Sequence, residues 1–188
     1  MRVGDSPAAR VSTPPVNGQA RRLAQEDTGS VTAETYRVVA RLIEAGVVPS
    51  EVYGDLYERD TLGRLRLRGL ILSRTVGELD GTLMHTYVTK EDFETMGAEP
   101  SDTEDAINLT LAVAGAQAAV IFVGQIRGGF KLSFRSQCDM DCNEIAKQFG
   151  GGGHKAAAGA FQEGTLEEVQ ERVLTVVRKA MTEALGMN

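Results

Sequence analysis

The chain has 188 residues, of which 42% are hydrophobic and 24% are charged, a composition that suits one medium globular domain or two small ones. Its 20 basic and 26 acidic side chains give a net charge of −6, which argues against broad, sequence-independent binding of nucleic acid but leaves room for a local pocket for one small anion. No apolar run approaches the roughly 18 residues of a membrane helix. Cys138 and Cys142 are too few for a secreted disulfide framework, so we interpret them as reduced thiols and expect a cytoplasmic protein without a membrane partner.

The N-terminal part of the chain changes from irregular to helical near residue 31. Residues 1–30 carry Pro, Ser, Arg and Gly without a hydrophobic period and are interpreted as a flexible leader, with a transit peptide as the alternative. The spacing of the apolar residues then predicts a helix from Thr32 that ends at Gly46, a second helix from Ser50, and a third over 61–74. We interpret the four arginines of the third helix as a solvated face: Arg64, Arg66, Arg68 and Arg74.

From residue 76 strands and helices are mixed. Residues 76–89 predict a hairpin that turns at Asp80-Gly81. A short helix over 90–97 follows, and then a helix from Asp102 that carries three apolar residues, Ala106, Leu109 and Val113. The run "AAVIFV" at 118–123 is apolar on both faces, which is typical of a central strand.

The C-terminal third contains an alternating strand and two capped helices. In "FKLSFRS" at 130–136 every second side chain is polar, so Lys131, Ser133 and Arg135 point the same way. Asp141 can cap one helix, and a Thr-x-x-Glu box at 165–168 begins the last, whose expected stripe is Val169, Val173, Val176, Ala180 and Ala184. The predicted fold class is α/β (α+β): a mixed sheet with flanking helices over 76–188, preceded by a helical segment at 31–75.

The segment "QFGGGGHKAAAGAF" at 148–161 is the strongest functional signal. It is not a P-loop, because His154 precedes Lys155 and Ala156 stands where that motif needs a hydroxyl. Two interpretations stay open. The glycines can end a helix and allow close packing, or their backbone N–H groups can converge on an anion that His154 and Arg135 also hold.

The stretch "LSFRSQ…DCNEIAKQFGGGGHKAAAGAF" resembles the C-terminal, DHH-associated domain of DHH-family phosphoesterases, in the RecJ-like branch of nanoRNases and pAp phosphatases. The likeness extends upstream to "DTGS" at 27–30. Such enzymes hydrolyse short oligoribonucleotides or pAp-type nucleotides with two manganese ions held by the N-terminal DHH domain, while the C-terminal domain grips the substrate. The resemblance implies substrate-binding roles for Arg135, Ser136, Gly151, Gly152, Gly153 and His154.

The departures from that family concern the metal site. The chain has no Asp-His-His triplet, and Asp27 alone matches a family metal ligand, after a segment too polar for a buried strand. One carboxylate cannot hold two metals. We therefore interpret residues 31–75 as a helical remnant of the DHH domain with its linker helix and 76–188 as the DHH-associated substrate-binding domain. We expect no manganese bound by this chain alone and no activity alone.

Two other functions fit part of the sequence. The first is a non-catalytic module that dimerises or docks through the apolar faces of the helices at 33–75. The second is a transfer-RNA-associated domain, because alanyl-tRNA synthetases carry a similar Gly-Gly-Gly-His segment; the acidic balance of the chain argues against it.

Overall fold

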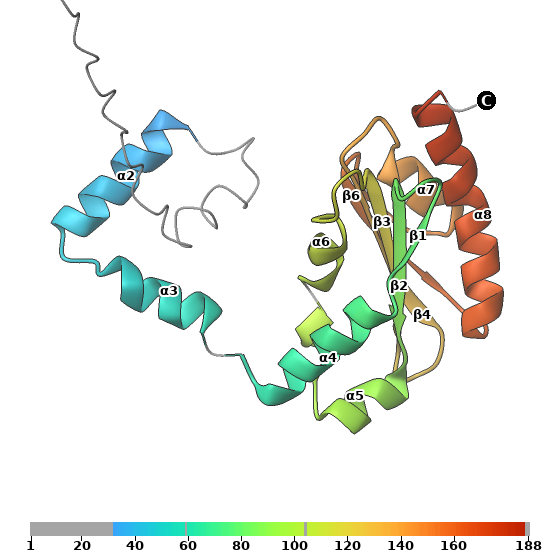
Figure 1. Cartoon of the computed structure of the whole chain (residues 1–188), viewed down its shortest axis with the longest axis horizontal. Coiled ribbons are helices and arrows are strands. Elements are labelled where there is room, and N and C mark those ends of the chain that lie inside the picture. The colour runs from blue at the N-terminus through green and yellow to red at the C-terminus, as the bar shows by residue number, and fades with distance from the viewer. Residues whose placement is uncertain (1–31, 59, 104, 187–188) are drawn as a thin grey trace, which may run out of the picture. The chain divides into compact units, whose positions relative to one another are not determined.

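The computed structural model describes residues 32–58, 60–103 and 105–186 (Figure 1). The proposed leader at 1–30 and the proposed metal ligand Asp27 lie outside these residues. By its contacts the chain divides into two units, 1–59 and 60–188, which we describe separately. The helix predicted over 61–74 belongs to the second unit. The sequence-based division at residue 75, with a remnant of the DHH domain before it, stays a prediction.

The first unit consists of helices α2, Ala33–Glu44, and α3, Pro49–Tyr57. Thr32 caps α2, as its sequence predicts, because its hydroxyl accepts the backbone N–H of Thr35. Gly46 follows α2 with φ +99°, a conformation that favours glycine. Not one residue of α2 is buried, and its apolar side chains are exposed: Tyr36, Val38, Val39, Leu42 and Ile43.

The second unit is built on a six-stranded mixed sheet with the order β1-β2-β3-β4-β6-β5. Only β2 and β3 are parallel; the other neighbouring strands are antiparallel. The strands are β1 Val76–Glu78, β2 Leu83–Val88, β3 Ala118–Gly124, β4 Phe130–Ser136, β5 Gly152–His154 and β6 Ala157–Gln162. The hairpin between β1 and β2 confirms the prediction, since Leu79, Asp80 and Gly81 all have positive φ at the turn.

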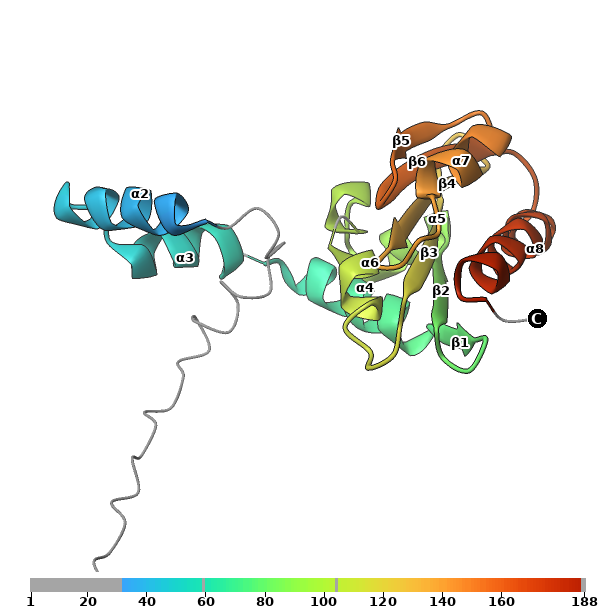
Figure 2. The same ribbon diagram turned by 90° about the horizontal axis from the view of Figure 1, so that it is seen from above.

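Helices cover the two faces of this sheet unequally (Figures 1 and 2). The helices are α4 Leu62–Ser73, α5 Lys90–Met96, α6 Ala106–Thr110, α7 Cys142–Gln148 and α8 Leu166–Ala184, with a 3₁₀ helix, η1, at Pro100–Thr103. One core joins α7 and α8 to the first face. The second core joins α4, α5 and α6 to the other face, but its strand residues come from β2 and β3 only. The same face of β4 and β6 is therefore outside the helical core.

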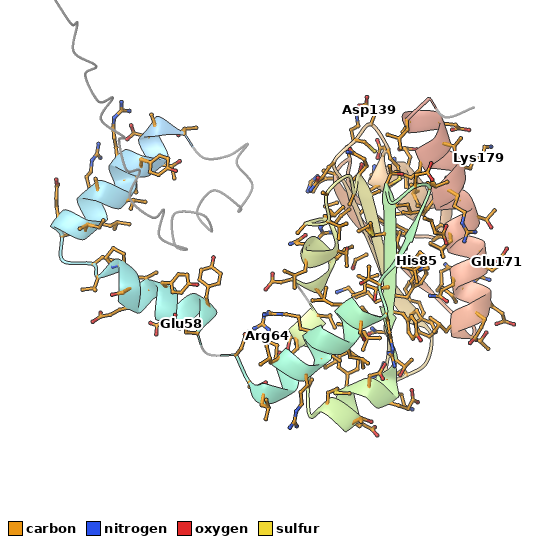
Figure 3. The ribbon with its side chains drawn as sticks, in the orientation of Figure 1. Glu58, Arg64, His85, Asp139, Glu171 and Lys179 are labelled. Atoms are coloured by element: carbon orange, nitrogen blue, oxygen red, sulfur yellow. The ribbon has the colours of Figure 1, made fainter. Side chains whose placement is uncertain are left out.

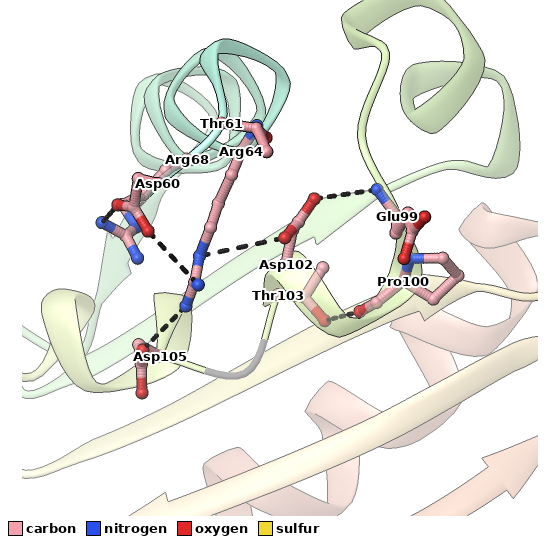
Figure 4. Close-up of polar contacts among 9 residues, drawn as sticks. All are labelled: Asp60, Thr61, Arg64, Arg68, Glu99, Pro100, Asp102, Thr103 and Asp105. Atoms are coloured by element: carbon pink, nitrogen blue, oxygen red, sulfur yellow. Dashed lines mark hydrogen bonds and ion pairs between the residues drawn. The ribbon is translucent and has the colours of Figure 1, made fainter. Parts of the chain in front are cut away.

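Helix α4 is fixed on this unit by close packing and by its arginines. A Cβ on Gly63 would lie 1.9 Å from the carbonyl oxygen of Gly97, so only glycine allows this approach. Arg64 pairs with three carboxylates (Figure 4), those of Asp60, Asp102 and Asp105, at 3.2, 3.9 and 3.1 Å. Arg68 and Arg74 also form ion pairs, with Asp60 and Asp92. The interpretation of these arginines as a solvated face is thus wrong for all but Arg66, which is exposed.

Two predicted helices differ in detail. The helix expected from Asp102 is divided into η1 and the short α6, and Leu109 and Val113 are exposed rather than buried. Helix α8 begins with the predicted capping box, but its buried stripe runs through Val169, Val173, Leu174, Val177 and Met181. The buried residues Val169, Val173, Val177 and Met181 follow one another at intervals of four. The expected Val176, Ala180 and Ala184 therefore lie beside the buried stripe and are half-buried.

Candidate functional site

Three of the four consecutive glycines are required by the fold itself. Gly150 follows α7 with φ +72°. A Cβ on Gly151 would lie 2.1 Å from the carbonyl oxygen of Gly159. A Cβ on Gly153 would lie 2.6 Å from the carbonyl oxygen of Ala157, and the φ angle of Gly153 itself is +153°. Any side chain at these positions would push β5 away from β6 or strain the backbone. The structural interpretation of the glycines therefore holds for three positions.

Gly152 differs from its neighbours. A Cβ there would meet only the Oδ1 atom of Asn143, at 3.6 Å, which is ordinary van der Waals contact, and its φ lies outside the left-handed region. Backbone angles therefore do not exclude a side chain at this position. The packing of the described residues thus gives no reason for glycine at 152.

The N–H groups of the glycines are largely occupied. Those of Gly150 and Gly151 donate to carbonyl oxygens of α7, at 3.1 and 2.9 Å. That of Gly153 donates to Oδ1 of Asn143 at 3.0 Å. The idea that consecutive free N–H groups converge on an anion is therefore wrong for these three residues.

The strand register places Arg135 and His154 in one row. Arg135 in β4 is opposite Ala157 in β6, and Ala157 is opposite His154 in β5. Cross-strand partners share a face, so the two residues lie on the same side of the sheet, about 10 Å apart over two strand spacings. Both side chains are long enough to reach an anion between them.

Arg135 and His154 differ from Lys155 in their polar contacts. Its guanidinium is half-buried and donates to the carbonyl oxygen of Phe134 at 3.1 Å. It has no carboxylate partner among the described residues. The ring of His154 is exposed and has no hydrogen bond to another described residue. By contrast, Lys155 next to it is paired with Asp139 at 3.0 Å.

Ser136 lies on the opposite side of the sheet from Arg135. It is buried and opposite Ala118 of β3. Its hydroxyl accepts the N–H of Cys138 at 3.2 Å and lies 3.1 Å from the carbonyl oxygen of the same residue. The serine therefore orders the turn after β4 and thereby fixes the end of the strand that carries Arg135.

A cavity of about 450 Å³ lies at Arg135, where η1 and α6 meet β3 and β4, beside the surface of β4 and β6 that is outside the helical core. We call this surface the open face; it is formed by Lys131, Ser133, Arg135, Ala157, Gly159 and Phe161 of β4 and β6, in register. The edge of the second core borders it, since Ile107 of α6 and Ile121 of β3 also line the cavity. The alternation of polar and apolar residues in β4 predicted that Lys131, Ser133 and Arg135 point to the same side. It did not predict which part of the sheet lies outside the helical core.

Other polar groups of the second unit lie outside this row of residues. Burial raises the pKa of the Cys142 thiol to about 11 despite the nearby Arg135 charge, so this cysteine stays protonated at neutral pH. No group of three or more metal-ligating side chains occurs within the described ranges. His85 (Figure 3) contacts Glu78 at 3.0 Å, and Glu78 also pairs with Arg178 of α8. This trio links β1, β2 and α8.

Sequence reasoning missed Asn143. Its position, two residues after the cap Asp141, is where a helix begins, and nothing in the local pattern indicates a tertiary contact. The fold brings it to the glycines, where its amide oxygen holds the N–H of Gly153 and its side chain borders Gly152. Its amide NH₂ group makes no hydrogen bond to another described residue and is a further donor beside Gly152.

Comparison with known proteins places the chain in a family. Residues 81–183 match the DHHA1 domain family. Over 177 residues the chain is 33% identical to the bifunctional oligoribonuclease and PAP phosphatase NrnA of Thermus thermophilus, covering 94% of this chain and 52% of that protein. The protein of the same name from Bacillus subtilis is 27% identical over 139 residues, 71% of this chain and 43% of that one. The chain spans about half the length of these relatives.

Two solved structures share the architecture. An exopolyphosphatase-related protein from Bacteroides fragilis superimposes with a TM-score of 0.72 at 27% identity, over 82% of this chain and 44% of that one. A pGpG-specific phosphodiesterase from Vibrio cholerae has a TM-score of 0.50 at 14% identity, over 81% of this chain and 52% of that one; this second likeness concerns the fold. In the part of the chain that the structure describes, no helix combines the length and the apolar character needed to span a bilayer.

Proposed function

This chain belongs to the DHHA1 domain family, and on that premise we propose that it is the substrate-binding part of a DHH phosphoesterase for short oligoribonucleotides or pAp-type nucleotides. The observation that carries the proposal is the row in which Arg135 and His154 lie on one sheet face; among the described residues Arg135 has no carboxylate partner and the ring of His154 has no hydrogen bond. The names of the NrnA relatives supply the class of substrate.

Each residue of the proposed site has a separate role. Arg135 donates a planar pair of N–H groups to a phosphate, and His154 adds a directed donor from the other side. Gly152 leaves the main chain bare so that the ligand can approach it. Gly151, Gly153 and Ser136 keep the two strands and the turn in place.

The manganese site of the parent family does not fit the described part of this chain. No cluster of three metal-ligating side chains is found there, and Asp27 lies outside it. We therefore derive no catalytic step. We propose that the chain alone does not hydrolyse pAp or a dinucleotide in the presence of manganese. Phosphate release that persists after Asp27→Ala and rigorous purification would contradict this.

The binding itself is tested by titrating pAp into the wild type, Arg135→Ala and Lys179→Gln. Lys179 is an exposed lysine of α8, on the helix layer over the other face (Figure 3), and serves as the control for a lost positive charge. Removal of the guanidinium should weaken binding by about tenfold to a hundredfold, since a hydrogen bond to a charged group contributes about 1.5–3 kcal/mol. Equal affinity of the three proteins would contradict the proposed site.

A second function is supported by one observation. Helix α2 has an exposed apolar surface, which includes Tyr36, Leu42 and Ile43. Exposed apolar surfaces of this kind mark interaction sites. We propose that a second copy of the chain covers this face. A cytoplasmic location stays a prediction.

A further inference from the structure

The cavity at Arg135 adjoins a second, larger cavity of about 760 Å³. The two share Pro100 and Gln125 in their walls and are therefore neighbours; Lys131, Ser133 and Arg135 of the open face line the smaller one, and Phe161 lines the larger one. The second cavity is bounded by the turn between β3 and β4 and by the end of β6, where Arg127, Phe161 and Glu163 line it. Its volume lies in the range of ligand sites.

Phe161 is the unusual residue of the second cavity. It is 47% exposed although it lies in a strand, and its partner across the sheet is Lys131 of β4. Its ring rests against the turn, because a Cβ on Gly129 would lie only 2.6 Å from its Cζ atom. The absent side chain at Gly129 thus makes room for the ring, and the backbone of the turn supports it. A supported, solvent-facing aromatic ring is a platform for stacking.

The charges of the two cavities differ. Among the described residues, the walls of the smaller cavity contain Lys131 and Arg135 and no carboxylate, whereas the walls of the larger cavity contain both Arg127 and Glu163. Lys131 has no ion-pair partner among the described residues. Phosphate groups are therefore favoured in the smaller cavity. An uncharged base is favoured in the larger one, where a carboxylate can accept hydrogen bonds from an exocyclic amine.

The spacing along β4 indicates the length of the ligand. Lys131 and Arg135 are four residues apart on one face, which corresponds to about 13 Å at roughly 3.3 Å per residue. With both side chains extended away from the sheet, the two cations keep about this separation, which is more than one phosphate spans. A chain of at least two nucleotides can span it, with its backbone following the strand.

We propose that the open face binds a single-stranded oligoribonucleotide, with one phosphate at Arg135 and His154, a further phosphate at Lys131, and a base stacked on Phe161. This inference rests on the proposed function and adds a second nucleotide subsite to it. It predicts that the chain binds a trinucleotide more tightly than pAp, because pAp, with both of its phosphates on one nucleotide, is too short to extend from Arg135 to Lys131.

The chain has no tryptophan, so Phe161→Trp introduces a single fluorescent reporter at the platform. Titration with a tri-ribonucleotide should quench this fluorescence in a saturable way, whereas pAp and inorganic phosphate should bind without comparable quenching. Absence of quenching by a trinucleotide whose binding is measured by calorimetry would overturn the inference.

Matched variants separate the two subsites. Phe161→Leu keeps apolar bulk but removes the aromatic ring, and should weaken trinucleotide binding by about tenfold to a hundredfold while leaving pAp binding unchanged. Phe161→Tyr should restore it, and Lys131→Gln should weaken the trinucleotide only. Circular dichroism verifies that each variant is folded.

The outcomes distinguish the inference from the proposed function. If Arg135→Ala weakens both ligands but the Phe161 and Lys131 variants change neither, the second subsite is wrong and the first stands. If Phe161→Leu weakens pAp as much as the trinucleotide, the platform belongs to the first subsite and the inference is also wrong. If neither ligand binds the wild type, both proposals fail.

Discussion

Alanine substitution at the glycines of residues 150–153 separates a structural role from a ligand role. In Gly151→Ala the new methyl group would meet the carbonyl oxygen of Gly159 at 2.1 Å and the Cβ of Ala160 at 2.6 Å. Both distances are far below van der Waals contact, so β5 must move from β6. Such overpacking costs about 1–3 kcal/mol. Gly153→Ala adds a strained positive φ to a similar clash and should cost at least as much.

Gly152→Ala should behave in the opposite way. Its methyl group meets only Asn143 at 3.6 Å, and alanine restricts the unfolded chain more than glycine does. The free energy of unfolding should therefore change by less than about 1 kcal/mol in either direction. If a ligand approaches the main chain at this residue, the same methyl group should nevertheless lower the affinity for pAp by about tenfold or more.

The assay combines urea unfolding, followed by circular dichroism, with calorimetric titration of pAp for each of the three variants. The expected pattern is two destabilised variants and one stable variant that binds poorly. A Gly152→Ala protein as unstable as Gly151→Ala would refute the packing analysis. A stable Gly152→Ala protein with unchanged affinity would refute the proposed approach of the ligand.

Three further predictions concern stability and assembly. Burial lowers the pKa of His85 below its ordinary 6.5, so as the pH falls the unfolded chain binds this proton before the folded chain does. The free energy of unfolding should therefore fall as the pH drops below about 6.5. His85→Gln should reduce this pH dependence, measured by urea unfolding. Asp92→Asn should cost about 1–3 kcal/mol in thermal unfolding, because Asp92 accepts hydrogen bonds from both Arg74 and the N–H of Thr89. Deletion of residues 1–59 should abolish self-association in analytical ultracentrifugation, and a full chain that is monomeric at all concentrations would contradict the docking role of α2.

The sequence predicts elements well where the local chemistry is sufficient. Helix caps such as Thr32 and Thr165, the Asp80-Gly81 turn and the alternation of β4 depend on a few neighbouring residues, and the structure confirms them. The buried run of β3 also follows from its composition, because a strand apolar on both faces needs cover on both sides.

Features set by tertiary contacts were not predictable. The arginines of α4 look like a solvated face until Asp60, Asp102 and Asp105 are brought beside Arg64. The four glycines look alike in sequence, but neighbouring strands make three of them obligatory and leave Gly152 without a packing reason. Which part of the sheet stays uncovered depends on where α4, α5 and α6 pack, and local patterns do not encode that.

The central claim is that Arg135 and His154 hold one ligand together, and a double-mutant cycle tests it most directly. The affinity for pAp is measured by calorimetry for the wild type, Arg135→Ala, His154→Ala and the double variant, with folding verified for each. Residues that contact the same group are coupled, so the double variant should lose markedly less than the sum of the two single losses, by about 0.5 kcal/mol or more. Strictly additive losses, or no loss in either single variant, would contradict the account.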